Sequence, residues 1–356
     1  MKNILVVDDS ALMRRVICDI IDSDERFHVQ ERATNGLEAL ELLSKNTYDA
    51  VLLDVNMPRM NGLELLKELQ KRKIAVKIMM VSTDTSEGAK TTLDALELGA
   101  LDFVQKPGSA MDCRSEEFKE KLLRTLSAVV NSRMPVFEKA FTREKMETSR
   151  KVVELVSRKA SSVTGNKIVA LASSTGGPKA LQSVVPRLPA NLKAPVVIVQ
   201  HMPAGFTASL AERLDSLSEI HVKEAKEGDV LQAGTVYLAM GGKHLNILTS
   251  GEKYTIHYSD EPSREGVKPC ANYMYESLEN SQYDQVVCVV MTGMGADGTK
   301  GILSLKRKKK LYVIAQEAST CAVYGMPKSI VNANLADQVV PLEQIAQEII
   351  MNVGVN

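Results

Sequence analysis

Residues 167–181 read KIVALASSTGGPKAL, and they predict a β-strand, a tight turn of small residues and an α-helix in direct succession. The run at 168–172 is short and apolar, as in a buried strand, and Pro178 suits the first turn of a helix. Further buried strands are expected downstream, at 195–200, 235–238, 285–291 and 312–315. Strands that alternate with helices predict a parallel sheet with helices on both faces.

An earlier series of the same kind runs from residue 2 to about residue 108. Its buried strands are expected at 4–7, 51–54, 76–81 and 102–104, with apolar residues at helical spacing between them. Residues 134–166 have no buried-strand signal and carry many charges. We therefore predict an α/β fold of two doubly wound, mainly parallel-sheet domains, at 1–130 and 166–356, joined by a partly helical linker at 131–165.

The composition excludes several classes of protein. The chain has 356 residues, and 44 lysines and arginines balance 44 aspartates and glutamates, which removes any bulk electrostatic argument for binding nucleic acid or an anionic membrane. The apolar runs are far shorter than the roughly 20 residues of a membrane-spanning helix, and the opening MKNILVVDDS lacks the features of a signal peptide. The five cysteines form no CxxC pair, which argues against a disulfide framework or a zinc site. We expect a cytoplasmic protein that does not insert into a membrane.

Acidic residues follow strands of the N-terminal series. Asp8 and Asp9 end the strand at 4–7, and Asp54 ends the strand at 51–54. Because the carboxyl ends of parallel strands meet at one edge of a sheet, we expect these three carboxylates in one cleft. Such a cluster requires a cation, and its oxygen ligands suit Mg²⁺, while one carboxylate can attack phosphorus to form an acyl phosphate. For any one of these acids alone, capping of the next helix is the simpler interpretation.

Two further strand ends supply a hydroxyl and a cation. Ser82 closes the strand at 76–81, and Lys106 follows the strand at 102–104, where its ammonium can pair with a phosphoryl group. Together, these strand ends resemble the receiver domain of two-component response regulators over about the first 106 residues. The resemblance implies Asp54 as the phosphoacceptor, Asp8, Asp9, Asp54 and the backbone of Asn56 as the Mg²⁺ site, Ser82 and Lys106 as a switch pair, and Phe103 as an aromatic rotamer switch.

Three side chains with catalytic potential follow strands of the C-terminal series: Ser174, His201 and Asp297. Two of them have a simpler interpretation on their own, because the glycine-rich turn that carries Ser174 is more often a phosphate cradle and Asp297 can cap a helix. His244 is a rival base. Together the three allow acyl transfer, in which His201 takes the Ser174 proton, Asp297 orients the imidazole and turn amides stabilise an oxyanion.

Four segments of the chain resemble the protein-glutamate methylesterase (CheB) family of bacterial chemotaxis: STGGP, QHMPAGFTASLAERLD, TGMGADG and YGMPKSI. The resemblance runs through the whole chain and implies a flavodoxin-like receiver domain followed by a Rossmann-like methylesterase domain. It implies Ser174 as the nucleophile, His201 as the base, Asp297 as the orienting acid and the Met294 amide in the oxyanion hole. Ser173 adds a second hydroxyl beside Ser174, so the choice of nucleophile rests on the alignment with STGG.

The same resemblance implies the activity. It predicts a phosphorylation-activated hydrolase that removes methyl esters from glutamates of methyl-accepting chemoreceptors, releases methanol and also deamidates receptor glutamines. A chemotaxis histidine kinase is the implied phosphodonor, and ester hydrolysis is expected to need no cofactor. The alternative is a response regulator whose output domain binds a nucleotide without catalysis, although neither GxGxxG nor GxxxxGK[ST] is present. A DNA-binding output is disfavoured, because the second domain is large, α/β and balanced in charge.

Overall fold

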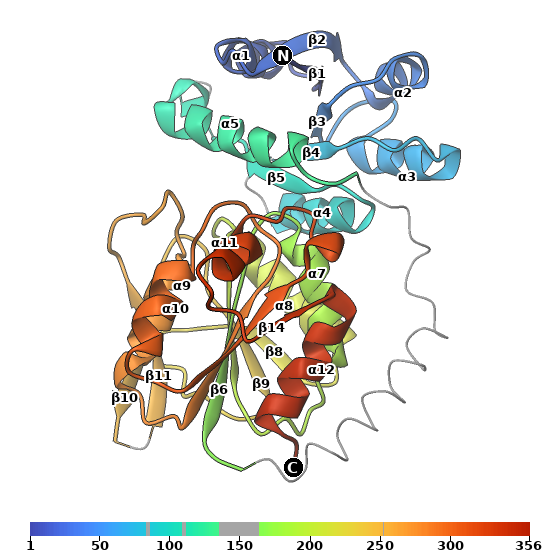
Figure 1. The fold of residues 1–356 in the computed structure, drawn as a ribbon. Helices are drawn as coiled ribbons and strands as arrows, with labels where there is room; N and C mark the ends of the chain where they lie inside the picture. Colours follow the sequence, from blue (N-terminus) through green and yellow to red (C-terminus); the bar gives the residue numbers. More distant parts are fainter. Residues whose placement is uncertain (83–85, 109–111, 135–163, 252) are drawn as a thin grey trace. The chain divides into compact units, whose positions relative to one another are not determined.

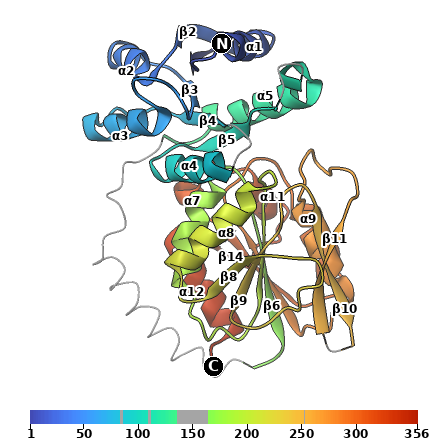
Figure 2. The same ribbon diagram turned by 180° about the vertical axis from the view of Figure 1, so that it is seen from behind.

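A computed structural model describes residues 1–82, 86–108, 112–134, 164–251 and 253–356. The chain divides into two compact units, Met1–Glu138 and Lys139–Asn356. Each unit is built on a parallel sheet covered by helices, which confirms the predicted fold class (Figures 1 and 2). Most of the predicted linker, 135–163, lies outside the described residues, and the predicted domain boundaries stay predictions.

The first unit alternates strands and helices along the chain. In order these are β1 (Lys2–Val7), α1 (Ala11–Asp22), β2 (Phe27–Ala33), α2 (Gly36–Lys45), β3 (Ala50–Asp54), α3 (Gly62–Arg72), β4 (Ile78–Ser82), α4 (Ser86–Glu97), β5 (Asp102–Gln105), the 3-10 turn η1 (Asp112–Arg114) and α5 (Glu116–Val130). The strands pair in parallel in the order β2-β1-β3-β4-β5. Helices α2, α3 and α4 cover one face, and α1 and α5 cover the other (Figure 1). The strand order reverses between β1 and β3, and at such a reversal the carboxyl ends of the strands border a crevice.

The second unit contains the other elements of the chain. In order these are β6 (Lys167–Ser173), α7 (Gly177–Val184), η2 (Val185–Arg187), β7 (Val196–Gln200), α8 (Phe206–Leu217), β8 (His221–Glu224), β9 (Thr235–Leu238), β10 (His244–Ser250), β11 (Lys253–Ser259), α9 (Ala271–Ser277), η3 (Leu278–Asn280), β12 (Gln285–Val290), α10 (Thr299–Lys306), β13 (Leu311–Gln316), η4 (Ala318–Thr320), α11 (Met326–Asn332), β14 (Gln338–Val340) and α12 (Leu342–Val353). The main sheet has the parallel order β14-β13-β12-β6-β7-β9-β8. Here the order reverses between β6 and β12.

The central strands of this sheet are buried on both faces. Every residue of β7 and of β12 is buried, as expected for a parallel sheet with helices on both sides. Helices α7, α8 and α12 lie on one face, and α9, α10 and α11 lie on the other (Figures 1 and 2). Strands β6, β7 and β12 are therefore held on both faces by packed helices, and their carboxyl ends lie at one edge of the sheet.

The sequence analysis missed the antiparallel hairpin of β10 and β11. Both strands mix buried residues with partly or fully exposed ones, whereas the prediction followed runs of consecutive apolar residues. The strand predicted at 76–81 begins two residues later, at Ile78, and ends at Ser82. Within the described residues, no helix combines the length and the apolar character that crossing a bilayer requires.

Candidate functional site

The first unit gathers three carboxylates at the reversal between β1 and β3. Asp8 and Asp54 are buried, Asp9 is exposed, and one oxygen from each lies within 4.8 Å of the others. Backbone hydrogen bonds hold the two buried carboxylates. Ser10 N donates to Asp8 Oδ1 at 2.9 Å, and Val55 N donates to Asp54 Oδ1 at 2.7 Å. This set of hard oxygen ligands fits Mg²⁺.

Lys106 lies against the two buried carboxylates. Its Nζ is 2.6 Å from Asp54 Oδ2 and 2.8 Å from Asp8 Oδ2. Burial raises the pKa of Asp54 more than the Lys106 ammonium lowers it. Burial also lowers the pKa of Lys106, but the charges of Asp54 and Asp8 outweigh that effect, and the net pKa of Lys106 is raised. Lys106 is therefore charged at neutral pH.

The predicted switch residues lie at the neighbouring strand ends. Ser82 ends β4 and is fully buried, Phe103 lies buried in β5, and Asn56 is exposed after β3. The sequence analysis missed Thr92 of α4, whose hydroxyl donates to the Gly88 carbonyl at 2.7 Å and lies 2.8 Å from Ser82 Oγ. Thr92 belongs to no motif, so only the packing of α4 on the sheet identifies it.

In the second unit, Ser174, His201 and Asp297 follow β6, β7 and β12, which are neighbours in the sheet. His201 N donates to the Ser173 carbonyl at 3.1 Å, so the backbones after β6 and β7 lie side by side. His201 Nε2 lies 2.8 Å from Asp297 Oδ2. The structure therefore brings the predicted imidazole and carboxylate together at the edge where Ser174 begins its turn.

Asp297 is held by a set of donors from one segment. Ala271 N lies 2.6 Å from Oδ2, while Asn272 N and Cys270 Sγ lie 2.9 and 3.0 Å from Oδ1. Burial raises the pKa of Asp297, but the hydrogen bond and charge of His201, together with these donors, outweigh burial and lower the pKa to about 2. The carboxylate is thus ionised at neutral pH and can only accept hydrogen bonds. His201 Nε2 must carry a hydrogen toward it, which leaves Nδ1 as the basic nitrogen.

Burial separates the two candidate nucleophiles. Ser173 is fully buried, and its hydroxyl donates to Gln200 Oε1 at 2.7 Å, whereas Ser174 is partly exposed. Gln200 Nε2 in turn donates to the carbonyls of Ser174 and His201, at 3.0 and 3.2 Å. Gln200 was not predicted from the sequence, yet it ties together the two turns that carry Ser174 and His201.

Comparisons with known proteins agree with this geometry. Residues 169–349 match the CheB methylesterase family, and residues 4–115 match the response regulator receiver domain family. The protein-glutamate methylesterase/protein-glutamine glutaminase of Pyrococcus abyssi (strain GE5 / Orsay) is 42% identical over 347 residues, covering 98% of this chain and 92% of the relative. The chain belongs to the CheB methylesterase family. A relative with the same name from Bacillus subtilis (strain 168) is 40% identical, and the match covers 98% of each chain.

A solved structure in the CheB methylesterase family resembles the second unit. The Thermotoga maritima CheB methylesterase catalytic domain is 41% identical, covers 53% of this chain and 98% of its own, and has a TM-score of 0.51. The family resemblance predicted from the sequence is therefore confirmed.

His244, the rival base, lies in the interior of this CheB family member, where both of its ring nitrogens are hydrogen-bonded. It is fully buried, Nδ1 accepts from Cys270 N at 3.2 Å, and Nε2 lies 3.2 Å from the Pro262 carbonyl, to which it donates. Burial lowers the pKa of His244. With both ring nitrogens occupied, His244 supports the segment around Cys270 rather than serving as a base.

Met294, assigned by the CheB resemblance to the oxyanion hole, lies on a loop beside the Ser174 turn. Ser174 N donates to the Thr292 carbonyl at 3.0 Å, and Met326 N donates to the Gly293 carbonyl at 2.8 Å. The Met294 side chain is 38% exposed. These backbone bonds hold the two residues before Met294, and the role of the Met294 amide stays a prediction.

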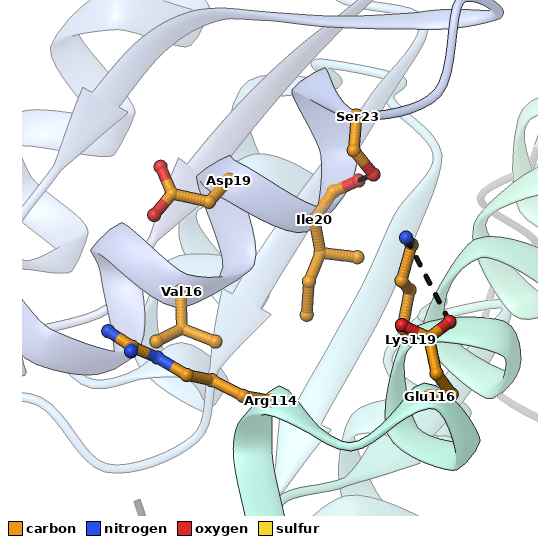
Figure 3. Close-up of a pocket in the computed structure, with 7 residues that line it drawn as sticks. All are labelled: Val16, Asp19, Ile20, Ser23, Arg114, Glu116 and Lys119. Atoms are coloured by element: carbon orange, nitrogen blue, oxygen red, sulfur yellow. Dashed lines mark hydrogen bonds and ion pairs between the residues drawn. The ribbon is translucent and has the colours of Figure 1, made fainter. Parts of the chain in front are cut away.

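A pocket of about 300 Å³ lies in the receiver unit between α1 and the start of α5 (Figure 3). Its lining is Val16, Asp19, Ile20, Ser23, Arg114, Glu116 and Lys119. None of the predicted site residues of the CheB family is among them. The pocket therefore belongs neither to the carboxylate cluster nor to the Ser174 turn.

Proposed function

We infer that this chain is a phosphorylation-regulated protein-glutamate methylesterase of chemotaxis that also has protein-glutamine glutaminase activity. Relatives with this double name match nearly the whole chain, and the chain joins a receiver domain to a methylesterase domain. These relatives favour the hydrolase over the alternative of a nucleotide-binding output domain. The observation that carries the chemistry is the 2.8 Å contact between His201 and Asp297 beside the Ser174 turn.

In the proposed reaction, Ser174 Oγ attacks the ester carbonyl while His201 Nδ1 takes its proton. Asp297 keeps the imidazole in the required tautomer and favours its protonated form, and the Met294 amide donates to the oxyanion. The C–O bond then breaks, and His201 gives the proton to the departing methoxide, which leaves as methanol. Water hydrolyses the acyl-enzyme by the same steps. With a glutamine substrate the leaving group is ammonia.

The receiver carries the regulation in this proposal. Asp54 is the phosphoacceptor, and Asp8, Asp9, Asp54 and the Asn56 carbonyl would hold Mg²⁺, whose charge would offset that of the carboxylates and of a phosphoryl group. Lys106 would leave Asp54 Oδ2 and pair with the phosphoryl group. Ser82 and Phe103 would then respond to the new charge.

The partners follow from the same activity. Methyl-accepting chemoreceptors are the proposed substrates, and a chemotaxis histidine kinase is the proposed phosphodonor. Because the methylated receptor helices are cytoplasmic, we propose a cytoplasmic protein that neither inserts into the membrane nor binds nucleic acid. The five cysteines are buried and none of them is in a disulfide bond, which suits a reducing compartment.

The test is methanol release from methylated chemoreceptor by the full chain, with and without a small-molecule phosphodonor and Mg²⁺. We expect Ser174→Ala to abolish release, and Ser173→Ala, its buried neighbour, to retain most of it. Asp54→Asn should keep the basal rate and lose the response to the phosphodonor. Unchanged methanol release by Ser174→Ala would rule out the proposed hydrolase mechanism.

A further inference from the structure

Helices α9 and α10 pack against each other (Figure 1). Each is capped by a side chain from the other segment. Asp297, just before α10, accepts from Ala271 N and Asn272 N at the start of α9, at 2.6 and 2.9 Å. Asn272 Oδ1 accepts from Gly298 N at 3.1 Å and from Gly301 N at 2.7 Å, at the start of α10. Neither helix receives a side-chain cap from its own N-cap residue. The two caps are therefore reciprocal.

The close approach of the two helices depends on a glycine. A Cβ at Gly301 would lie 2.7 Å from the Asn272 carbonyl oxygen and 2.8 Å from its Cα, both backbone atoms that cannot easily move. Asn272 is fully buried, so its amide oxygen has no access to water as a substitute partner. The side chain is held in one place by the helix that it caps.

Helix α9 is also fixed to the strands of the site. The Tyr275 hydroxyl lies 3.1 Å from the Val289 carbonyl of β12 and 3.3 Å from the Ala170 carbonyl of β6. Tyr275 is fully buried. The segment that donates to Asp297 is thus anchored to the same strands that lead to Ser174 and Asp297.

We propose that Asn272 is a positioning residue of the hydrolase, whose side chain holds the start of α10 and so fixes Asp297 against His201. The proposal rests on the proposed function of the triad. Asn272 acts twice on Asp297: its backbone N–H binds Oδ1 directly, and its side-chain oxygen holds Gly298, the residue that follows Asp297. Gly298 N also donates to Asp297 Oδ1 at 2.8 Å, so a shift of Gly298 is passed directly to the carboxylate. Loss of the Asn272 side chain frees the start of α10 and so lets the carboxylate shift relative to the imidazole.

The first measurement is steady-state hydrolysis of methylated receptor by full-length variants. Asn272→Ala should lower kcat about 10- to 100-fold with little change in KM, because a small displacement of a catalytic group has effects of this size. Asn272→Asp keeps an acceptor for Gly298 N and Gly301 N, and should stay within about threefold of the wild type.

A matched control lies on the same helix. The Ser277 hydroxyl accepts from Ile247 N at 2.9 Å and has no bond to Asp297 among the described residues. Ser277→Ala therefore removes a side-chain acceptor from α9 without touching the triad, and should leave kcat unchanged. If Asn272→Ala and Ser277→Ala give the same kcat, Asn272 has only a structural role.

A double-mutant cycle separates positioning from general destabilisation. In an Asp297→Ala background, Asn272→Ala should cause no further loss of kcat, because the group that it positions is gone. An equal loss in both backgrounds contradicts the proposal. If Asn272→Ala does not fold, Gly301→Ala replaces it: this variant pushes against the Asn272 backbone and should lower kcat, and wild-type kcat in folded Gly301→Ala overturns the proposal. Activity of Ser174→Ala tests the proposed function separately.

Discussion

His201 Nε2 and Asp297 Oδ2 lie 2.8 Å apart, and their side chains are only 9% and 3% exposed. In this setting, Asp297→Asn presents an amide that can donate its N–H to Nε2 and so stabilise the tautomer protonated at Nδ1. That tautomer cannot take the Ser174 proton. We expect kcat for methyl ester hydrolysis to fall by about 10³- to 10⁴-fold while the fold persists, because the imidazole is held in the wrong tautomer. Methanol release and circular dichroism spectra measure the two effects. A loss of less than tenfold would contradict the proposed role of Asp297.

The ionisation of Asp297 also predicts a dependence of stability on pH. Its folded-state pKa of about 2 is below the usual 3.8, so ionised Asp297 stabilises the fold above pH 3.8, and this contribution is lost as the pH falls through about 2. The difference in the free energy of unfolding between the wild type and Asp297→Asn should become about 1 kcal/mol smaller as the pH falls from 5 to 3. Urea unfolding at each pH measures it. Ile302→Val changes the core without removing a titratable group, so its difference from the wild type in the free energy of unfolding should not shrink at low pH. An equal decrease for both variants would contradict the low pKa of Asp297.

The sequence could predict the residues that directly follow apolar strands. Asp8, Asp54, Ser174 and His201 each end such a run or come just after it, and the rule that parallel strands end at one edge brings them together without any knowledge of the packing. Asp297 lies farther from its strand, so its contact with His201 depended on the loop path as well.

The residues that hold the site could not be predicted in this way. Asn272, Gln200 and Thr92 act through partners distant in sequence or on another element, and none belongs to a chemical motif. Asn272, for example, bonds to Gly298 and Gly301 only because α9 and α10 start side by side. Their roles depend on tertiary packing, which local periodicity does not encode.

Removal of the Lys106 ammonium should change both the stability of the receiver unit and its response to Mg²⁺. Lys106→Met leaves Asp8 and Asp54 buried without their ammonium partner, which should lower the stability of the receiver unit by about 3 kcal/mol. Since the site is then more negative, Mg²⁺ should raise the melting temperature of Lys106→Met more than that of the wild type. Lys2→Met, which removes an exposed ion pair with Asp49, should cost less than about 1 kcal/mol and keep the wild-type response. An equal Mg²⁺ response in both variants would show that Lys106 does not compete with the metal.

The position of Ser174 depends on the absence of a side chain at Gly293. A Cβ at this position would lie 2.5 Å from Met326 Sδ and 2.7 Å from Ser174 Cβ, so Gly293→Ala must push the nucleophile or the loop that faces it. We expect kcat to fall at least about tenfold, because misplacement by about 1 Å has effects of this order or larger. Gly228→Ala is the matched control: its φ is +79° but no atom lies within 4 Å of the added Cβ, so it should lose about 1 kcal/mol of stability through backbone strain and keep its kcat. Steady-state hydrolysis and thermal unfolding of both variants separate the two effects. If Gly293→Ala loses stability but not kcat, Ser174 tolerates displacement, and the tight packing around it serves the fold alone.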